Sequence, residues 1–279
     1  MLKKLILCLG LFATLLFGET FKDGLDAYQK GDFKISLNIW QDLASKGDAL
    51  SQNYLGYMYE KGIGVKQDYK KAIEFYEKSA NQGYEHAQFT LGLMYGNGQV
   101  IKRDYKKAKE FYEKAANQGL QEAQFYLAMM YEEGQGINKD YKKAIEWYEK
   151  SANQGFVISQ FNLGFMYENG QGVNKDYKKA IEWYEKAVAQ GFSTAYNNIG
   201  YMYERGQGVN KDYKKAKELY EKAANEGIVE AQNNLGLLYE NGKGVNQDKK
   251  IAKSWFAKAC KSGYQDSCYR YKILDEQGY

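Results

Sequence analysis

One segment of the chain returns at a constant interval, and this repetition constrains the fold more than any other feature. NKDYKKAIEWYEKSANQG, residues 138–155, reappears almost unchanged as NKDYKKAIEWYEKAVAQG at residues 174–191. Each copy contains one aspartate, and these aspartates lie 36 residues apart: Asp68, Asp104, Asp140, Asp176, Asp212 and Asp248. A period of this length is typical of solenoid proteins, in which one supersecondary unit stacks on the next.

The repeated segment has the residue spacing of an amphipathic helix. Tyr141, Ala144 and Tyr148 fall on one apolar stripe, while lysines and glutamates occupy the other positions. Asp140 precedes the stripe, where its carboxylate can accept hydrogen bonds from the first turn. Gly155 follows it, where a left-handed residue is favoured. The pattern predicts a helix over residues 141–154 as the second helix of its unit.

A first helix is predicted ahead of it, over residues 120–133, joined to the second by a loop that contains two glycines. The residue after the leucine or isoleucine of this helix is small in every unit: Gly56, Gly92, Ala128, Gly164, Gly200 and Gly236. A glycine inside a helix costs about 0.8–1 kcal/mol relative to alanine. Its repetition predicts a close approach of two helices that a larger side chain would block.

The repeats divide the chain into four parts. We expect a signal peptide at residues 1–18, a degenerate N-terminal repeat at 19–47, six repeats at 48–263 and a C-terminal capping helix at 264–279. Lys3 and Lys4 precede an apolar run of signal-peptide length, and cleavage is expected near Gly18. The mature protein is therefore expected in the periplasm or secreted, without stable membrane insertion.

The recurring pattern A-x-x-x-L-G-x-x-Y-x-x-G-x-G-V-x-x-D-Y-x-K-A-x-x-W-Y-x-K-A-A resembles the Sel1-like repeat, a relative of the tetratricopeptide repeat. The resemblance covers nearly all of the chain after the predicted signal peptide. It implies an all-α fold, a right-handed superhelical solenoid of antiparallel helix pairs whose first helices line a concave surface. It also implies an adaptor or scaffold that binds a protein or peptide on that surface, and we expect no cofactor.

Functional residues are expected where the copies differ, on the exposed side of the first helices. The tetratricopeptide analogy places these positions two residues before and two residues after the leucine. The first series is Asn53, Phe89, Phe125, Phe161, Asn197 and Asn233, and the second is Tyr57, Leu93, Met129, Phe165, Tyr201 and Leu237. Apolar and amide side chains in a row suit an extended peptide, but the alternative is that the aromatics pack between neighbouring helices.

A third series lies five residues after the leucine and reads Glu60, Gly96, Glu132, Glu168, Glu204 and Glu240. A glutamate near a helix C-terminus opposes the helix dipole by about 0.3–1 kcal/mol, so its recurrence predicts a cationic partner. We expect a loop lysine such as Lys139, Lys175 or Lys211. The alternative is an acidic rim that selects basic ligands.

Charge and cysteine content narrow the choice of partners. The net charge of +4 comes from lysines interleaved with glutamates rather than clustered on one side, so no nucleic-acid binding is expected. The chain is expected to be a monomer.

Cys260 and Cys268 follow the predicted signal peptide, and an even pair in an exported protein predicts a disulfide. Two thiols without a nearby histidine make a poor zinc site, so no metal is expected.

The spacing of this pair is similar to that in the Helicobacter cysteine-rich proteins, exported Sel1-like repeat proteins in which nearly every unit carries one. Here the matching positions of three other units are alanine and glutamine instead: Ala80 and Gln88, Ala116 and Gln124, and Ala152 and Gln160. That resemblance implies an alternative function, because some cysteine-rich members are described as penicillin-binding proteins or weak β-lactamases.

The residues give this alternative no support. No serine is followed by a lysine three residues later, the S-D-N and K-T-G motifs are absent, and His86 is the only histidine. The main prediction is therefore a protein that binds and does not catalyse. A further alternative is an assembly subunit that bridges envelope components through a lysine-rich convex face.

Overall fold

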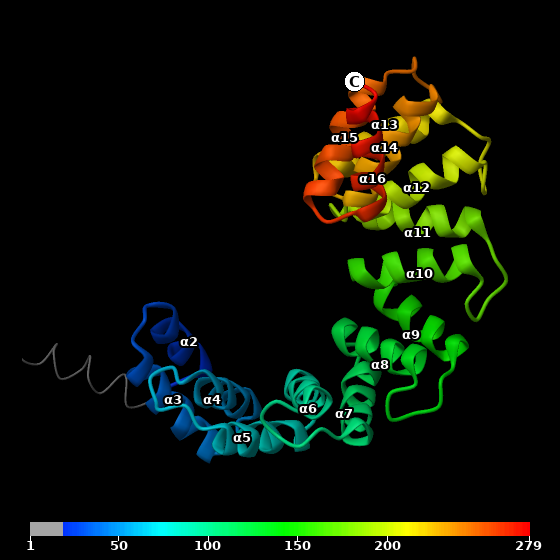
Figure 1. Ribbon diagram of the computed structural model, residues 1–279. Coiled ribbons are helices and arrows are strands. Elements are labelled where there is room, and N and C mark those ends of the chain that lie inside the picture. The colour runs from blue at the N-terminus through cyan, green and yellow to red at the C-terminus, as the bar shows by residue number, and fades with distance from the viewer. Residues whose placement is uncertain (1–18) are drawn as a thin grey trace, which may run out of the picture. The chain divides into compact units, whose positions relative to one another are not determined.

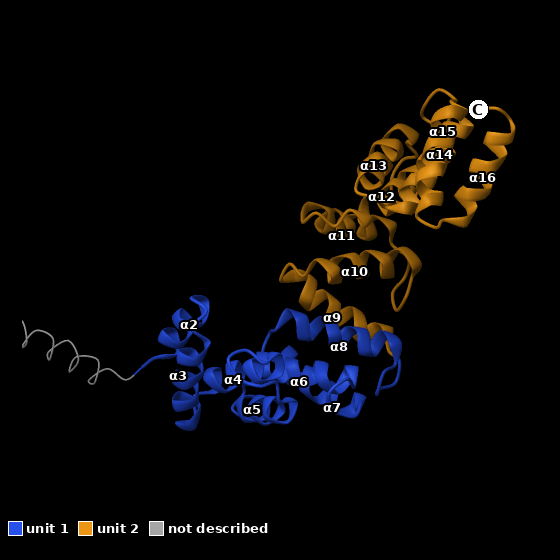
Figure 2. Cartoon of the chain, turned by 60° about the vertical axis from the view of Figure 1, so that its left-hand side comes forward, with its two compact units in different colours: residues 1–139 blue, residues 140–279 orange. Residues whose placement is uncertain are grey.

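The computed structural model describes residues 19–279, so the predicted signal peptide lies outside the described residues. The chain forms two compact units, residues 1–139 and 140–279, each with its own packed helices (Figure 2). Fifteen helices and no strand occur within residues 19–279 (Figure 1). In each unit every helix packs on the next one along the chain. The predicted all-α solenoid of antiparallel helix pairs is confirmed.

The helices of the first unit are α2 (Phe21–Gln29), α3 (Phe33–Ser45), α4 (Ala49–Lys61), α5 (Tyr69–Asn81), α6 (Glu85–Asn97), α7 (Tyr105–Asn117) and α8 (Gln121–Glu133). Those of the second unit are α9 (Tyr141–Asn153), α10 (Val157–Asn169), α11 (Tyr177–Ala189), α12 (Thr194–Arg205), α13 (Tyr213–Asn225), α14 (Val229–Asn241), α15 (Lys249–Lys261) and α16 (Gln265–Glu276). From α4 to α15, even-numbered helices are the first helices of the repeats and odd-numbered helices are the second.

The second helices begin and end as their sequence predicts. The Asp140 carboxylate accepts hydrogen bonds from the backbone amides of Lys142 and Lys143, each at 3.1 Å. Gly155, just beyond the end of α9, has a φ of 98°. An aspartate N-cap such as Asp140 stabilises a helix by about 1 kcal/mol.

In five of the six repeats a glycine inside the first helix lets an aromatic ring of the second helix lie directly on the backbone. A Cβ added to Gly92 would lie 2.6 Å from Tyr112 Cδ1, and one added to Gly164 would lie 2.6 Å from Tyr184 Cδ1. These rings are buried, and they form the centre of each helix pair. The predicted close approach of the two helices is confirmed at these positions.

A buried glutamine links successive repeats. Gln88 Nε2 donates to the carbonyl oxygen of Ala80 at 3.0 Å, and Gln88 Oε1 accepts from Gln118 Nε2 at 2.8 Å. In the last repeat Cys260 and Cys268 occupy the positions of this alanine and glutamine and form a disulfide with a Cα–Cα distance of 4.6 Å. The predicted disulfide is confirmed, and a covalent bond there stands where repeats with the alanine–glutamine pair have a hydrogen bond.

Candidate functional site

The positions two residues after the leucine remain at the surface. Tyr57, Phe165 and Tyr201 are exposed, and Leu93, Met129 and Leu237 are half-buried. Asn53 and Tyr57 line one cleft of about 360 Å³ together with Tyr76, Tyr84 and His86. This series therefore has the accessibility that partner binding requires.

The positions two residues before the leucine are less accessible than the sequence predicts. Phe125 is 8% exposed and Asn233 is 7% exposed, so the expectation that both face solvent is wrong. Asn53, Phe89, Phe161 and Asn197 are half-buried. The physical reason is that a side chain at this position points toward the neighbouring helices.

Ring contacts explain the burial of the aromatic members. The Phe89 ring centroid lies 5.5 Å from that of Tyr126, and the Phe161 centroid lies 4.9 Å from that of Phe192. Such pairs contribute about 0.5–1.5 kcal/mol beyond their buried area. The packing alternative therefore describes Phe89 and Phe161 better than a free groove does.

The asparagines of the second unit bind one another and a serine. Asn234 Nδ2 donates to Asn197 Oδ1 at 3.0 Å, and Ser267 Oγ donates to Asn233 Oδ1 at 2.9 Å. The predicted capture of a peptide backbone by these amides is therefore weakened, because their oxygens already have partners within the fold.

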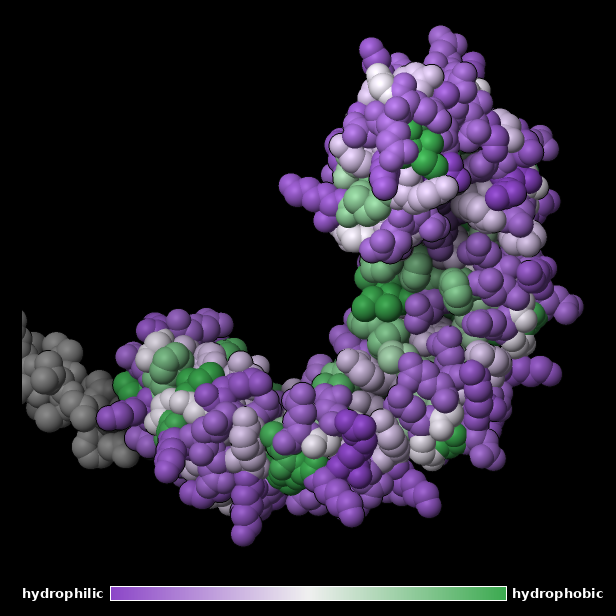
Figure 3. Space-filling view, in the orientation of Figure 1, coloured by the Kyte–Doolittle hydropathy of each residue, from purple (hydrophilic) through white to green (hydrophobic). Residues whose placement is uncertain are grey.

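An apolar ridge follows α10. Ile158 is 39% exposed and Phe165 is 41% exposed, and these residues are seven positions apart on one face of the helix. Phe161 lies between them, half-buried, and Figure 3 shows hydrophobic surface gathered around α10. Exposed apolar side chains grouped in this way mark interaction sites more often than scattered ones do.

Three glutamates of the third series accept hydrogen bonds from tyrosines of the second helices. Tyr76 Oη donates to Glu60 Oε2 at 2.9 Å, Tyr184 Oη to Glu168 Oε2 at 2.7 Å and Tyr220 Oη to Glu204 Oε2 at 3.0 Å. These tyrosine donors were not predicted, and a loop lysine, as expected, is an additional partner of one of the three glutamates. Glu204 also has Lys243 at 3.7 Å, and Glu240 pairs with Arg270 at 2.7 Å.

Burial is the largest influence on the pKa of both members of the Tyr184–Glu168 pair. It raises the pKa of Tyr184 well above its usual range, and the Glu168 carboxylate adds to that increase. Burial also raises the pKa of Glu168, against the opposing effects of the Tyr184 hydroxyl and Lys175. Glu60, Glu168 and Glu204 are thus acceptors within the fold, which weakens the acidic-rim alternative for these three.

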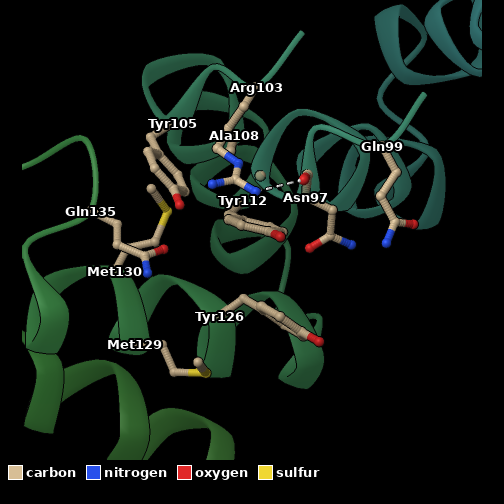
Figure 4. Close-up of a pocket in the computed structure, with 11 residues that line it drawn as sticks. Asn97, Gln99, Arg103, Tyr105, Ala108, Tyr112, Tyr126, Met129, Met130 and Gln135 are labelled. Carbon is tan, nitrogen blue, oxygen red and sulfur yellow. Dashed lines mark hydrogen bonds between the residues drawn. The ribbon is translucent and has the colours of Figure 1, made fainter. Parts of the chain in front are cut away.

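The repeat that has Gly96 in place of glutamate contains a cleft of about 450 Å³, which the sequence reasoning missed (Figure 4). Residues of α6, α7, α8 and two loops line it, among them Arg103, Tyr112, Tyr126 and Met129. The missing glutamate was an available sequence signal, because Gly96 interrupts an otherwise regular series.

Residues 19–279 contain no group of three or more histidine, cysteine, aspartate or glutamate side chains placed to hold a metal ion. Within the same residues, none of the helices has both the length and the apolar character needed to cross a membrane.

Stacked helix pairs with a 36-residue period define an α-solenoid repeat protein. The chain belongs to the Sel1 repeat family, whose model matches residues 49–84, 85–120, 121–156, 157–192, 193–228 and 229–264. Proteins of this family are generally protein-interaction scaffolds. No curated protein matches the chain.

Several solved structures are similar to the chain. The chain is similar to c5321, a protective antigen of uropathogenic Escherichia coli with an SLR fold, with a TM-score of 0.81, 36% identity and 87% of this chain covered. It spans about half of that protein, 52% of its length. A Sel1 repeat protein from Oxalobacter formigenes matches with a TM-score of 0.73 and 28% identity over 87% of this chain and 97% of the other. Cysteine-rich protein B of Helicobacter pylori is 31% identical over 47% of this chain and 93% of its own, with a TM-score of 0.38.

Proposed function

We propose that this protein is an exported scaffold that binds a protein or peptide partner on the face formed by its first helices and performs no chemistry itself. The observation that carries the proposal is the apolar ridge of α10, where Ile158 and Phe165 stay exposed although Leu163 and Met166 of the same helix are buried.

The exposed series supports the same face. Tyr57, Phe165 and Tyr201 occupy equivalent positions in three repeats and differ in chemistry from the half-buried Leu93 and Met129. Framework positions are nearly constant between the copies, whereas these vary, as expected if the framework sets the fold and the variable residues select the partner.

Export is supported by two observations of different kinds. The sequence begins with a positively charged stretch and an apolar run of signal-peptide length. Cys260 and Cys268 form a disulfide, which persists in oxidising compartments such as the periplasm. Secretion of a tagged full-length chain into the periplasmic or extracellular fraction, with loss of residues 1–18, is the expected result.

The binding face is tested by retention of envelope proteins on the immobilised mature chain. The variant Ile158→Ala/Phe165→Ala removes the ridge, and Ile251→Ala/Tyr269→Ala is the matched control. Ile251 and Tyr269 are also exposed, at 39% and 70%, but lie on α15 and α16, away from the ridge. We expect at least a tenfold loss of one specific partner with the ridge variant and none with the control. Equal recovery of every partner by all three proteins would contradict the proposal.

β-Lactam binding or hydrolysis stays a prediction of the resemblance to the cysteine-rich proteins. Nitrocefin turnover by the purified mature chain tests it directly, and we expect no turnover above the buffer control.

A further inference from the structure

We propose that the cleft at Gly96 binds a carboxylate supplied by another molecule, in the place that the chain's own glutamate fills in the sister repeats. The Glu60 carboxylate accepts from Tyr76 Oη at 2.9 Å, and Glu168 accepts from Tyr184 in the same way. Gly96 offers no acceptor, and the hydroxyl of the equivalent Tyr112 makes no hydrogen bond within residues 19–279. The donor is in place, and its acceptor is missing.

Packing does not require the glycine at position 96. A Cβ there would lie 3.5 Å from Tyr112 Oη and 3.7 Å from Ala108 Cβ, which are ordinary contact distances. At Gly92, one turn earlier in the same helix, the added Cβ would lie 2.6 Å from the Tyr112 ring. Gly92 is therefore a steric necessity, whereas Gly96 removes a side chain that would fit and leaves the cleft open.

The following loop departs from its sister loops at the same place. The other loops have a second glycine with positive φ, at Gly64, Gly136, Gly172, Gly208 and Gly244. Such a glycine packs tightly: a Cβ on Gly136 would lie 2.5 Å from Tyr105 Cβ. Val100 replaces it, and no residue other than glycine has a positive φ within 19–279, so this loop follows a different course. Its Gln99 lines both the Gly96 cleft and a second cleft of about 190 Å³.

The lining of the Gly96 cleft carries positive charge and hydrogen-bond donors. Arg103 is its one charged residue, and no carboxylate lies among the lining residues that the structure describes. Its guanidinium donates to the carbonyl oxygen of Asn97 at 3.1 Å, which fixes the side chain at the cleft. Glu60 lines the neighbouring cleft, but its carboxylate is already engaged by Tyr76 and Lys61. Arginine paired with a carboxylate gives the stronger, charge-assisted class of hydrogen bond.

The occupant that best fits is an acidic side chain of the bound partner, and this part of the inference rests on the proposed scaffold function. The cleft volume of about 450 Å³ exceeds what one carboxylate needs, leaving room for neighbouring atoms of a peptide. Met129, one of the positions predicted to bind a partner, forms part of the wall, together with Tyr126. A free small carboxylate has the same head-group chemistry and is the other possible source.

Propionate is the direct probe, because it is the glutamate side chain detached from the backbone. We would titrate the mature protein with sodium propionate and with its neutral isostere propionamide, and follow backbone amide shifts. The expected result is saturable propionate shifts at Gly96 and Tyr112 with a dissociation constant on the order of millimolar, and none with propionamide. Gly96→Glu should abolish these shifts. Arg103→Gln introduces the residue that two other repeats have at the equivalent position, Gln67 and Gln247, and should weaken propionate binding about tenfold.

Two further experiments complete the test: a variant that should create a second binding site, and a titration with a peptide ligand. Glu60→Ala creates the same vacancy beside Tyr76 and should add propionate shifts there. An acetylated peptide with one central glutamate that binds at least tenfold tighter than propionate, and tighter than its glutamine counterpart, supports a partner side chain. Equal affinity supports the carboxylate site and assigns it to a free small carboxylate. Absence of propionate shifts near Gly96, or shifts that persist in Gly96→Glu, would overturn the inference, whereas failure of the scaffold function would appear separately with the Ile158→Ala/Phe165→Ala variant.

Discussion

The α4–α5 and α6–α7 pairs lie next to each other in the first unit, have the same helix lengths and share the glycine–tyrosine contact, yet they differ at the C-terminal end of the first helix. In α4–α5, Glu60 closes the end of the pair by accepting from the buried Tyr76. In α6–α7, Gly96 leaves Tyr112 facing a cleft. The same backbone thus serves as a sealed structural element in one repeat and as an open pocket in the next.

This difference teaches how a repeat protein separates stability from recognition. Contacts that every repeat makes, such as Gly56 on Tyr76 and Gly92 on Tyr112, fix the spacing of the helices. A contact that one repeat omits costs the fold little, because its neighbours supply the remaining interfaces. Sites for other molecules are therefore expected where a copy lacks a side chain that its sisters have.

Alkaline pH should produce the largest effect. Burial raises the pKa of Tyr76 and of Tyr112, and for Tyr76 the Glu60 carboxylate adds to the increase. Unfolded tyrosine ionises near pH 10, so the stabilising contribution of each buried ring is complete below pH 10 and is lost as the pH rises, by about 1.4 kcal/mol per pH unit.

We expect denaturant midpoints to fall steeply above pH 10, with Tyr112 ionising before Tyr76. Absorbance at 295 nm reports tyrosine ionisation, and circular dichroism followed in parallel reports helix content. The variants Tyr76→Phe and Tyr112→Phe identify which tyrosine each absorbance change belongs to. Ionisation of Tyr76 at pH 10 in a fully helical protein would contradict the account.

Gly92→Val should destabilise by about 1–3 kcal/mol, because its side chain would overlap the Tyr112 ring. The matched control in the same helix is Gly96→Ala, for which we expect no loss and a gain of up to about 0.8 kcal/mol from helix propensity. Urea unfolding of the two variants separates a glycine needed for packing from one that is not. Equal losses of unfolding free energy in both variants would contradict the claim that packing requires Gly92 but not Gly96.

Removal of the tyrosine hydroxyls should give a smaller but unequal effect. Tyr76→Phe removes the donor to Oε2 of the partly buried Glu60 carboxylate and should cost about 1–2 kcal/mol. Tyr112→Phe removes a hydroxyl that has no hydrogen bond among the described residues and should cost less than about 0.5 kcal/mol. Unfolding of the two variants at the same urea concentration would contradict the claim that the Tyr76 hydroxyl is bonded within the fold and the Tyr112 hydroxyl is not.

The fold was largely predictable, because each local signal in the sequence agrees with the others. Asp140, Gly155 and the apolar stripe from Tyr141 to Tyr148 specify one helix, and the 36-residue period then specifies its neighbours. The structure moves the predicted start of the first helix only from 120 to Gln121.

The site was less predictable, because accessibility depends on neighbours that a single helix does not reveal. Phe125 and Phe165 are both aromatic and occupy the same helical face, but one is 8% and the other 41% exposed. The partner of Glu168 was missed because Tyr184 lies 16 residues away on the facing helix, a distance that helical periodicity does not relate. The absence of glutamate at Gly96, together with Val100 in place of a loop glycine, could have indicated the cleft.

A double-mutant cycle of Gly96→Glu and Tyr112→Phe tests most directly whether Gly96 is an emptied glutamate site. The account predicts a favourable coupling free energy of about 1 kcal/mol between the introduced carboxylate and the Tyr112 hydroxyl, measured by urea unfolding. The cycle of Glu60→Ala and Tyr76→Phe provides the reference and should give the same sign and a similar size. A coupling within about 0.3 kcal/mol of zero for Gly96→Glu, alongside a clear coupling in the reference cycle, would contradict the account.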